Sequence, residues 1–569
     1  MKHLPVARTS VLFAAALVAG ASMAFAQAAP AQSEQSRLAE IARVAAQQFE
    51  ISRANVDAGQ TRPGVATPDV GAEVGLSLDD ATARALERNL ELAVERLNPQ
   101  TFDLNIARLE AAYRPTLTSL FGKNSRLQPP TSTLNGGFIV DNDQTIYNTG
   151  VTQALKWTGT DVTFAFNNNR QVTNNRNANF NPAYNNSFAL TAVQPLLRGF
   201  RIDGTRQQLA VTAINRDISE VQLRGTIATT MSAVRNAYWE LLYAIEAVGV
   251  ARGSLELAEK LVDDNRARVE VGTMAPLDVV QAEAEAATRR QALAQAEATW
   301  RTAELALKRL IVNGTEDPLW RASINPTDRP AFEPIALDVE GAVRKALEER
   351  TDLAQGRRTI EANDITLRFM RNQTLPLLDL QAQYGAAGLG GTQFQRSGGG
   401  GITSEIIGTI PGGYADAFRN LRNLDYPNWN FQLNLSYPLG GSAAQASLAR
   451  ARVQRNQSAA QLRAMELQVA TEVTNAALQV ENSLKRYEAA TAARSLAQTR
   501  LEAEQSRFDV GLSTNFFVVQ AQRDLATAQN TELRALLDYR RALVDFQRVQ
   551  EAPANRGGGI TTVQAQGGN

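Results

Sequence analysis

The sequence predicts an internally duplicated α+β membrane protein, in which long antiparallel α-helical coiled coils are combined with the strands of a transmembrane β-barrel. Three features support this prediction: a duplication across almost the whole chain, two very long heptad-patterned helices, and blocks of strands with alternating polarity. Each copy reads as helix, strands, long helix, glycine turn and second helix. A repeat of this length indicates two stacked modules rather than a short-repeat solenoid.

The duplication is visible as residues that recur at a constant separation. Ten residues of segment 79–122 reappear in segment 340–383, each 261 places later: Ala81, Ala85, Leu86, Glu87, Leu92, Ala93, Arg96, Asp103, Pro115 and Leu117 become Ala342, Ala346, Leu347, Glu348, Leu353, Ala354, Arg357, Asp364, Pro376 and Leu378. Further along, segment 188–195 pairs with 431–438, and Val271-Gly272 pairs with Val510-Gly511. The matched order predicts two structural repeats.

The first 26 residues have the pattern of a secretory signal peptide. Lys2 and Arg8 precede an apolar run over 11–20, and Ala24-Phe-Ala26 is a small-x-small cleavage signal. A membrane anchor needs about 20 apolar residues, roughly twice this run. The expected organisation is a signal peptide (1–26), an N-terminal helix near Glu34–Phe49 and a linker over 56–75 (together 27–75), a first repeat (76–330), a second repeat (331–551) and a flexible glycine-rich tail (552–569).

Composition excludes several classes of function. The chain has no cysteine, and its one histidine, His3, lies in the leader. Zinc sites with nitrogen and sulfur ligands, catalytic triads and histidine bases therefore lose their central residue, and no metal or cofactor is expected. The 58 basic and 58 acidic residues balance, without a basic patch for nucleic acid. No phosphate-binding glycine loop with its lysine is visible, so no motor is expected.

Each repeat is expected to open with a helix. Ser77 and Asp338 stand at equivalent N-cap positions, where a side-chain oxygen accepts an otherwise unpaired amide proton. The helices are expected to kink or end at Pro115 and Pro376, because proline lacks the amide donor and crowds the preceding turn.

Strands follow these helices. Segments 161–167, 187–193, 378–384 and 430–437 alternate polar and apolar residues, and the polar segments Asn167–Asn186 and Gly385–Asn428 read as outer loops. The first repeat carries extra sequence at 123–160, with a plausible strand at 151–157, and whether it adds a hairpin stays open. A soluble sandwich would alternate in the same way. Four strands per chain cannot close a barrel, which needs about eight, so an oligomer is expected.

Long helices come next. Residues 231, 234, 238, 241, 245 and 248 form a heptad seam, and Val473, Val480, Leu484 and Tyr487 repeat it in the second copy. Helices over 205–269 and 442–509 would each be about 100 Å long at 1.5 Å per residue. By themselves they are equally typical of a soluble antiparallel coiled coil.

These features together resemble the TolC-like outer-membrane efflux proteins, also called outer membrane factors. The residues that carry the resemblance are Leu76–Ala81, Arg114–Leu117, Gln194–Gly199 and the two Val-Gly turns, within a likeness over about 76–551. The resemblance implies a homotrimer in the outer membrane of a Gram-negative-type bacterium, with four strands per protomer forming a twelve-stranded barrel in lipid. It also implies a periplasmic helical tunnel that docks on a periplasmic adaptor and an inner-membrane pump.

The same resemblance assigns roles to the hairpin tips. Adaptor docking is expected at Val271, Gly272, Thr273, Val510, Gly511, Leu512 and Ser513. Asp278 matches an aspartate that holds the periplasmic end shut by pairing with an arginine, but Ser513 stands at the arginine position. Phe517 and Gln520 replace two constricting aspartates, and Phe508 replaces a gate tyrosine.

The chain therefore departs from the acidic gate of its relatives. We expect a hydrophobic constriction around Phe517, since apolar rings can gate by dewetting. Two alternatives stay open: Phe516 and Phe517 pack between helices, or Arg266 or Arg507 replaces the missing arginine.

The leading function is a passive outer-membrane duct of a tripartite efflux or type I secretion system. The alternative is a periplasmic coiled-coil protein that never inserts. An enzyme would need an acidic pair in a cleft, which the sequence does not locate. The sequence leaves the exported substrate and the class of pump open.

Overall fold

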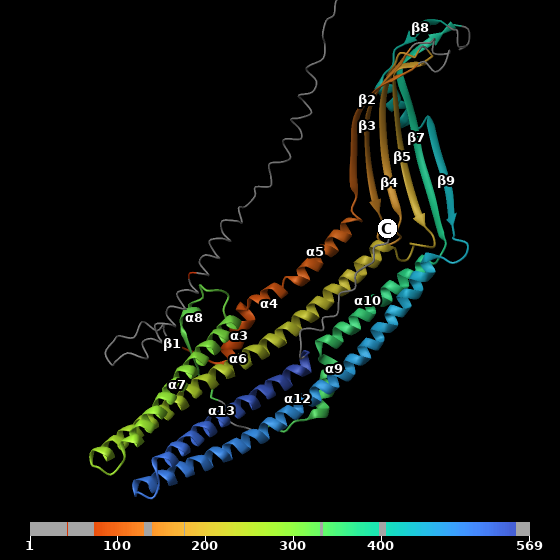
Figure 1. Cartoon of the computed structure of the whole chain (residues 1–569). Coiled ribbons are helices and arrows are strands. Elements are labelled where there is room, and N and C mark those ends of the chain that lie inside the picture. Colours follow the sequence, from red (N-terminus) through yellow and green to blue (C-terminus); the bar gives the residue numbers. More distant parts are fainter. Residues whose placement is uncertain are drawn as a thin grey trace, which may run out of the picture. The chain divides into compact units, whose positions relative to one another are not determined.

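The computed structural model describes Arg43 and residues 73–129, 139–175, 177–329, 334–397 and 405–553. The expected signal peptide and almost all of the N-terminal helix, linker and tail lie outside these residues. The chain forms two compact units: one contains residues up to Asn89, Ala237–Ala331 and Ala493–Leu533, and the other contains Leu90–Asn236, Phe332–Ala492 and the remainder from Arg534. Figure 1 shows the elements.

The two long helices are confirmed almost to the residue. Helix α6 covers Gly204–Glu270 and α12 covers Ala443–Asp509, with 67 residues each. Each is followed by a shorter helix, α7 (Pro276–Ile311) and α13 (Asn515–Glu551), which completes a helical hairpin (Figure 1).

Burial supports most of the predicted seam. Val234, Tyr238, Leu241 and Val248 are buried in α6, as are Val473 and Val480 in α12. Ile245 and Leu484 are only partly buried, so the seam is less regular than a strict heptad.

Shorter helices open the two repeats. The first has α3 (Leu78–Arg88), α4 (Leu90–Glu95) and α5 (Asn98–Ala111), and the second has α9 (Val339–Glu349) and α10 (Thr351–Gln373). The predicted caps are confirmed: Ser77 accepts from the Asp80 amide at 3.1 Å, and Asp338 accepts from the Gly341 amide at 2.9 Å. Helices α5 and α10 end before Pro115 and Pro376, as expected.

The predicted linker has a structured end. Residues Glu73–Leu76 form strand β1, which pairs in parallel with β6 (Ser323–Pro326), next to the short helix α8 (Pro318–Arg321). The Tyr238 hydroxyl on α6 lies 3.0 Å from the Leu76 carbonyl oxygen. Burial of the hydroxyl raises the pKa of Tyr238 to about 12, although its hydrogen bond with the Asp328 backbone acts in the opposite direction. The linker prediction was wrong over 73–75 because strand pairing outweighed the local glycine-rich composition.

The sheet in the second unit has seven antiparallel strands. These are β2 (Thr116–Gln128), β3 (Val140–Ala154), β4 (Asp161–Thr173), β5 (Phe180–Pro195), β7 (Leu377–Arg396), β8 (Ile406–Ile410) and β9 (Tyr426–Ser436). Their order is β2-β3-β4-β5-β7-β8, and β9 pairs with β7 beside its first half. The expected two strands per repeat is therefore wrong for both repeats. The first repeat contributes β2, β3, β4 and β5, because its extra sequence completes a hairpin, and the second contributes β7, β9 and the short β8.

Both predicted outer loops were too long. Strand β4 continues to Thr173 and β5 begins at Phe180, so most of the asparagine-rich segment is paired. Strand β7 continues to Arg396 and is followed by β8 and helix α11 (Tyr414–Asn423). Composition was misleading for two reasons. The asparagine-rich segments pair in register as strands, and glycine on β7 allows helix α11 to pack closely against the sheet. A Cβ on Gly388 would lie 2.0 Å from the Ala417 carbonyl oxygen.

Two neighbouring rows of paired residues cross all six long strands. One row, here called the apolar row, is Leu117, Val151, Phe164, Leu190, Tyr384 and Trp429. The adjacent row, here called the polar row, is Thr116, Thr152, Thr163, Thr191, Gln383 and Asn430. Successive residues of a strand point to opposite faces, so these rows lie on opposite faces of the sheet. All six residues of the apolar row are exposed in the single chain.

In the part of the chain that the structure describes, no helix combines the length and apolarity that a membrane crossing requires.

Candidate functional site at the helical hairpin tips

The two hairpin tips have the same backbone turn. Gly272 and Gly511 adopt left-handed φ angles of 77° and 79°. In the first tip the Gly272 amide donates to Val269 and the Thr273 amide to Arg268. In the second, Gly511 donates to Phe508 and Leu512 to Arg507. This is the Schellman motif, and it explains glycine at both positions, because other residues pay a steric cost there.

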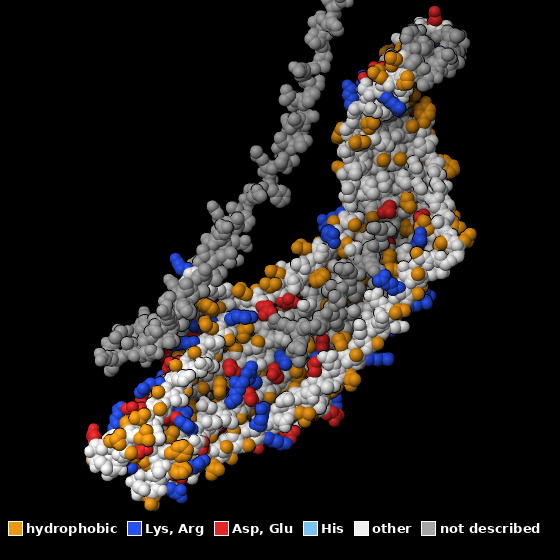
Figure 2. Space-filling model, viewed as in Figure 1, with side chains coloured by type: hydrophobic (Ala, Val, Ile, Leu, Met, Phe, Trp, Pro, Cys, Tyr) orange, Lys and Arg blue, Asp and Glu red, His pale blue; other side chains and the backbone are white. Residues whose placement is uncertain are grey.

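The tips carry exposed apolar side chains. Val271 and Leu512 are 73% and 80% exposed. The other exposed apolar residues here are Leu277, Val280, Val510, Phe516 and Phe517. Figure 2 shows hydrophobic side chains over the hairpin tips, at the lower left of the view. A cluster of this kind is typical of a protein interaction site.

Near the tips, two ionic contacts between described residues tie one hairpin to the other. The first joins the turns: an Arg268 guanidinium nitrogen lies 3.1 Å from an Asp509 carboxylate oxygen, and another donates to the Phe508 carbonyl at 3.2 Å. The Arg268 guanidinium also lies 4.2 Å from the centre of the Phe508 ring. Charge and ring stacking therefore act together across the hairpins.

The second tie joins a buried carboxylate to a half-exposed guanidinium. The carboxylate of Glu285 on α7 is 3% exposed and pairs with Arg523 on α13. Arg289, one turn further along α7, lies 2.6 Å from the other carboxylate oxygen. Burial alone would raise the pKa of Glu285, but the hydrogen bonds and positive charges of Arg523 and Arg289 outweigh it and lower that pKa.

The Asp278 carboxylate has no ion pair or side-chain hydrogen bond with any described residue. Its backbone carbonyl accepts from the Asn515 side chain at 3.3 Å. Ser513 donates instead to Glu504 at 2.8 Å, and Gln520 donates to Asp524 at 2.8 Å. The structure therefore brings Asp278 close to the second hairpin without an ionic contact.

The two arginines considered as replacements are engaged elsewhere. Arg266 pairs with Glu283 at 2.6 Å within its own hairpin, and Arg507 pairs with Glu504 at 3.2 Å. Neither pairs with Asp278 within the described chain.

The three phenylalanines differ in exposure. Phe508 is 6% exposed and packs with Leu261, Leu501 and Val518, so its ring belongs to the interhelical core. Phe517 is 50% exposed and contacts Phe516 edge-to-face, with ring centres 5.6 Å apart. Of these three rings, only those of Phe516 and Phe517 offer an exposed surface to another molecule.

Sequence reasoning missed the residues of both ties. A signal for the first was present, because the duplication that matches the two glycine turns also matches Arg268 with Arg507 and Glu270 with Asp509. Each tip therefore carries a base and an acid at fixed distances before its glycine. Which base meets which acid depends on how the hairpins pack, and the sequence does not contain that information locally.

The chain thus combines two long helical hairpins that have apolar tips with a sheet that has an apolar row on one face and a polar row on the other. Residues 145–313 and 342–549 match the outer membrane efflux protein family. The chain belongs to this family. No curated protein sequence matches it.

Solved structures share the fold. The chain is similar to the CmeC outer membrane channel of Campylobacter jejuni, with 13% identity, a TM-score of 0.58 and coverage of 86% of this chain and 93% of that one. It is also similar to VceC of Vibrio cholerae, with 15% identity, a TM-score of 0.58 and coverage of 84% of this chain and 96% of that one. A third similar structure is the open MtrE channel of Neisseria gonorrhoeae, with 17% identity, a TM-score of 0.56 and coverage of 84% of this chain and 89% of that one. The TolC-like resemblance is confirmed.

Proposed function

We propose that the protein is the outer-membrane channel of a tripartite efflux or type I secretion system. Three copies form a passive duct that carries substrates from a periplasmic adaptor and an inner-membrane pump to the exterior. The observation that carries this proposal is the pair of opposed rows in the sheet. An exposed apolar row through six strands suits lipid, and a polar row behind it suits a water-filled lumen.

The strands also favour membrane insertion over the alternative of a non-inserting periplasmic coiled coil. In Figure 2 the surface of the strand region is largely uncharged. Strand β9 presents Trp429, Phe431, Leu433 and Leu435, all at least 61% exposed, alternating with asparagine and glutamine. A periplasmic protein would leave this apolar surface in water, at about 25 cal/mol for each Å².

The exposed residues of the hairpin tips supply the adaptor-docking surface. Val271, Val510 and Leu512 project from turns whose backbone is fixed by the Schellman hydrogen bonds. Rigid turns lose little conformational entropy when a partner binds, so small apolar tips suffice for docking.

The closed state of the duct is held by the two inter-hairpin ties and narrowed by Phe517. These two ties hold the hairpins together in place of an ion pair made by Asp278. Opening then requires the pairs Arg268–Asp509 and Arg523–Glu285 to separate, because they join the two hairpins that move apart.

The experiment is fractionation followed by mass measurement. The mature chain should stay with outer membranes after a carbonate wash and give a trimer by native mass spectrometry in detergent. Purified trimers should conduct ions in planar bilayers. Release by carbonate as a monomer would support the periplasmic alternative instead.

A further inference from the structure

The six long strands form one continuous ladder that includes the hairpin of β3 and β4. Strand β2 pairs with β3 over its whole length, from Thr116 with Thr152 to Gln128 with Val140. Strands β3 and β4 pair between Ala154 with Asp161 and Asn142 with Thr173. The apolar and polar rows run through β2 and β3 without a change of face. The extra hairpin therefore has the two-faced pattern of the rest of the sheet.

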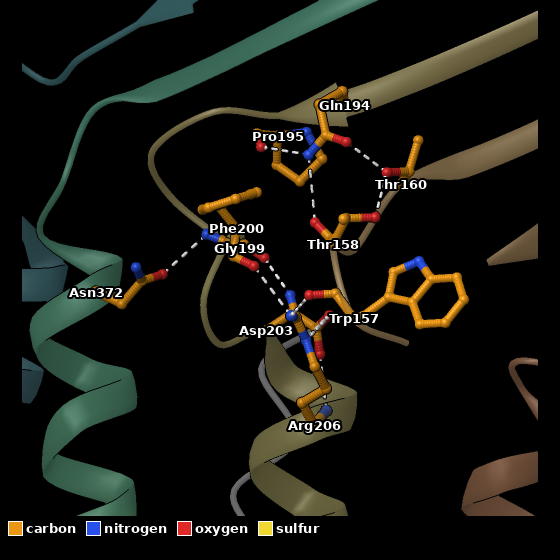
Figure 3. Close-up of polar contacts among 10 residues, drawn as sticks. All are labelled: Trp157, Thr158, Thr160, Gln194, Pro195, Gly199, Phe200, Asp203, Arg206 and Asn372. Atoms are coloured by element: carbon orange, nitrogen blue, oxygen red, sulfur yellow. Dashed lines mark hydrogen bonds and ion pairs between the residues drawn. The ribbon is translucent and has the colours of Figure 1, made fainter. Parts of the chain in front are cut away.

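The turn of this hairpin is also bound to the base of the sheet, as Figure 3 shows. The Gln194 side chain, at the end of β5, donates to the Thr158 carbonyl at 3.3 Å and accepts from the Thr160 hydroxyl at 2.5 Å. Arg206, near the start of α6, donates to the Trp157 carbonyl at 3.4 Å and to the Gly199 carbonyl at 2.5 Å. A loose surface insertion would not require such contacts.

The two edges of the ladder are open in the single chain. Every residue of β9 is exposed, and almost every residue of β2 is exposed. Open edges with apolar side chains promote pairing with another chain, and natural proteins normally block them. Here β9 is 11 residues long and β2 is 13, so the edges match in length. Because successive neighbours in the ladder are antiparallel, an even number of strands leaves β9 antiparallel to the β2 of a next copy.

We infer that each copy contributes six strands, not four, to the barrel wall, and that β9 of one copy pairs with β2 of the next. This inference rests on the proposed trimer. Three copies of the six long strands give an eighteen-stranded barrel. Barrels of about eight strands are filled by their own side chains, whereas those of 16–18 strands leave an aqueous channel.

The polar row would line that channel with threonine, glutamine and asparagine. These side chains are uncharged hydrogen-bonding groups. This row therefore suits contact with water. Asp161 and Asp379 lie on the same face, two and four residues from the row, and would add negative charge to the lumen.

Cysteine cross-linking tests the position of the hairpin, because the natural chain has no cysteine. The Ser119 and Thr149 hydroxyl oxygens, on β2 and β3, lie 3.4 Å apart. The double variant Ser119→Cys, Thr149→Cys should form a disulfide within one chain. If Ser119→Cys instead cross-links to Phe188→Cys or Leu190→Cys on β5, then β2 lies next to β5, the hairpin is outside the wall and the inference is overturned.

The edge pairing is tested by scanning β9 against Ser119→Cys. Residue 119 shares its face with the apolar row, so cysteines at 429, 431, 433 or 435 should give covalent trimers on non-reducing gels. Cysteines at 430 and 432 point to the other face and serve as matched controls. Cross-linking at the control positions alone would overturn the pairing.

Strand counting by electron microscopy of trimers in nanodiscs gives an independent result. We expect eighteen strands, and twelve would overturn the inference. A native mass other than three copies would instead overturn the proposed trimer, while the cross-link between β2 and β3 would still report on the hairpin. The two failures are therefore distinguishable.

Discussion

Arg350 and Asn89 occupy the same joint in the two repeats, between the first two helices of each. Asn89 donates to the Leu310 carbonyl on α7 at 2.9 Å, and Arg350 donates to the Val549 carbonyl on α13 at 3.3 Å. The four residues correspond under the duplication. In both repeats a side chain between the first two helices donates to a carbonyl of the second helix of the hairpin. The donor is an uncharged amide in the first repeat and a buried guanidinium in the second.

Arg350 predicts the first effect. Its side chain is 1% exposed and pairs with Asp352 at 2.9 Å and Glu472 at 2.6 Å. Arg350→Ala would leave two carboxylates without their partner, at a cost of about 3–5 kcal/mol. Unfolding by urea should show this loss of stability. Arg344→Ala removes an exposed pair with Glu340 and should cost less than about 1 kcal/mol. If Arg350→Ala and Arg344→Ala lose the same stability, then leaving Asp352 and Glu472 without Arg350 does not destabilise the fold.

The helix seam can be tested at two neighbouring positions. Leu241 is fully buried and Ile245 only partly buried, so Leu241→Asp should reduce the outer-membrane level of the protein more than Ile245→Asp. A buried unpaired charge is far more costly than one that reaches water. Immunoblots of outer-membrane fractions give the comparison. If Ile245→Asp reduces the outer-membrane level more than Leu241→Asp does, then Ile245, and not Leu241, lies in the buried interface between the helices.

Glu285 predicts a dependence on pH. Its pKa is lowered in the folded protein, so the carboxylate contributes stability above its unfolded pKa of about 4.3, and this contribution is lost as pH falls through the folded pKa. The wild-type protein should therefore lose stability in acid more steeply than Glu285→Gln. Melting temperatures between about pH 3 and 7 test this. Parallel curves for the two proteins would exclude Glu285 as the source.

The tie between the turns predicts a change in gating. Arg268→Gln removes the contact with Asp509 and should raise the open probability of single channels in planar bilayers. Arg266→Gln is the matched control, because Arg266 pairs with Glu283 inside one hairpin. Each variant loses one positive charge, and the two positions are only two residues apart on α6. If they behave alike, the tie does not hold the hairpins together.

The constriction predicts an order of effects. Phe517→Ala should increase single-channel conductance, because it removes an exposed ring that would exclude water from the narrow end. Asp278→Asn should change conductance little, since its carboxylate has no ionic partner among the described residues. A large effect of Asp278→Asn with a silent Phe517→Ala would indicate an acidic gate formed between copies.

The sequence by itself determined the duplication, the caps at Ser77 and Asp338, the limits of α6 and α12, and the glycine turns at 272 and 511. Apart from the duplication, which is read by comparing two distant segments, these features depend on residues within one or two helical turns. Helix hydrogen bonds, capping and left-handed glycine conformations are all local, so their signals survive in a linear pattern.

Tertiary structure alone decided the strand count and the inter-hairpin contacts. The segments around Asn167 and Gly388 read as loops, yet they pair or pack because partners distant in sequence satisfy their backbone groups. Arg268 meets Asp509 and Glu285 meets Arg523 across about 240 residues. Such contacts depend on the register of whole hairpins and strands, which is set by packing of many side chains at once and not by any local pattern.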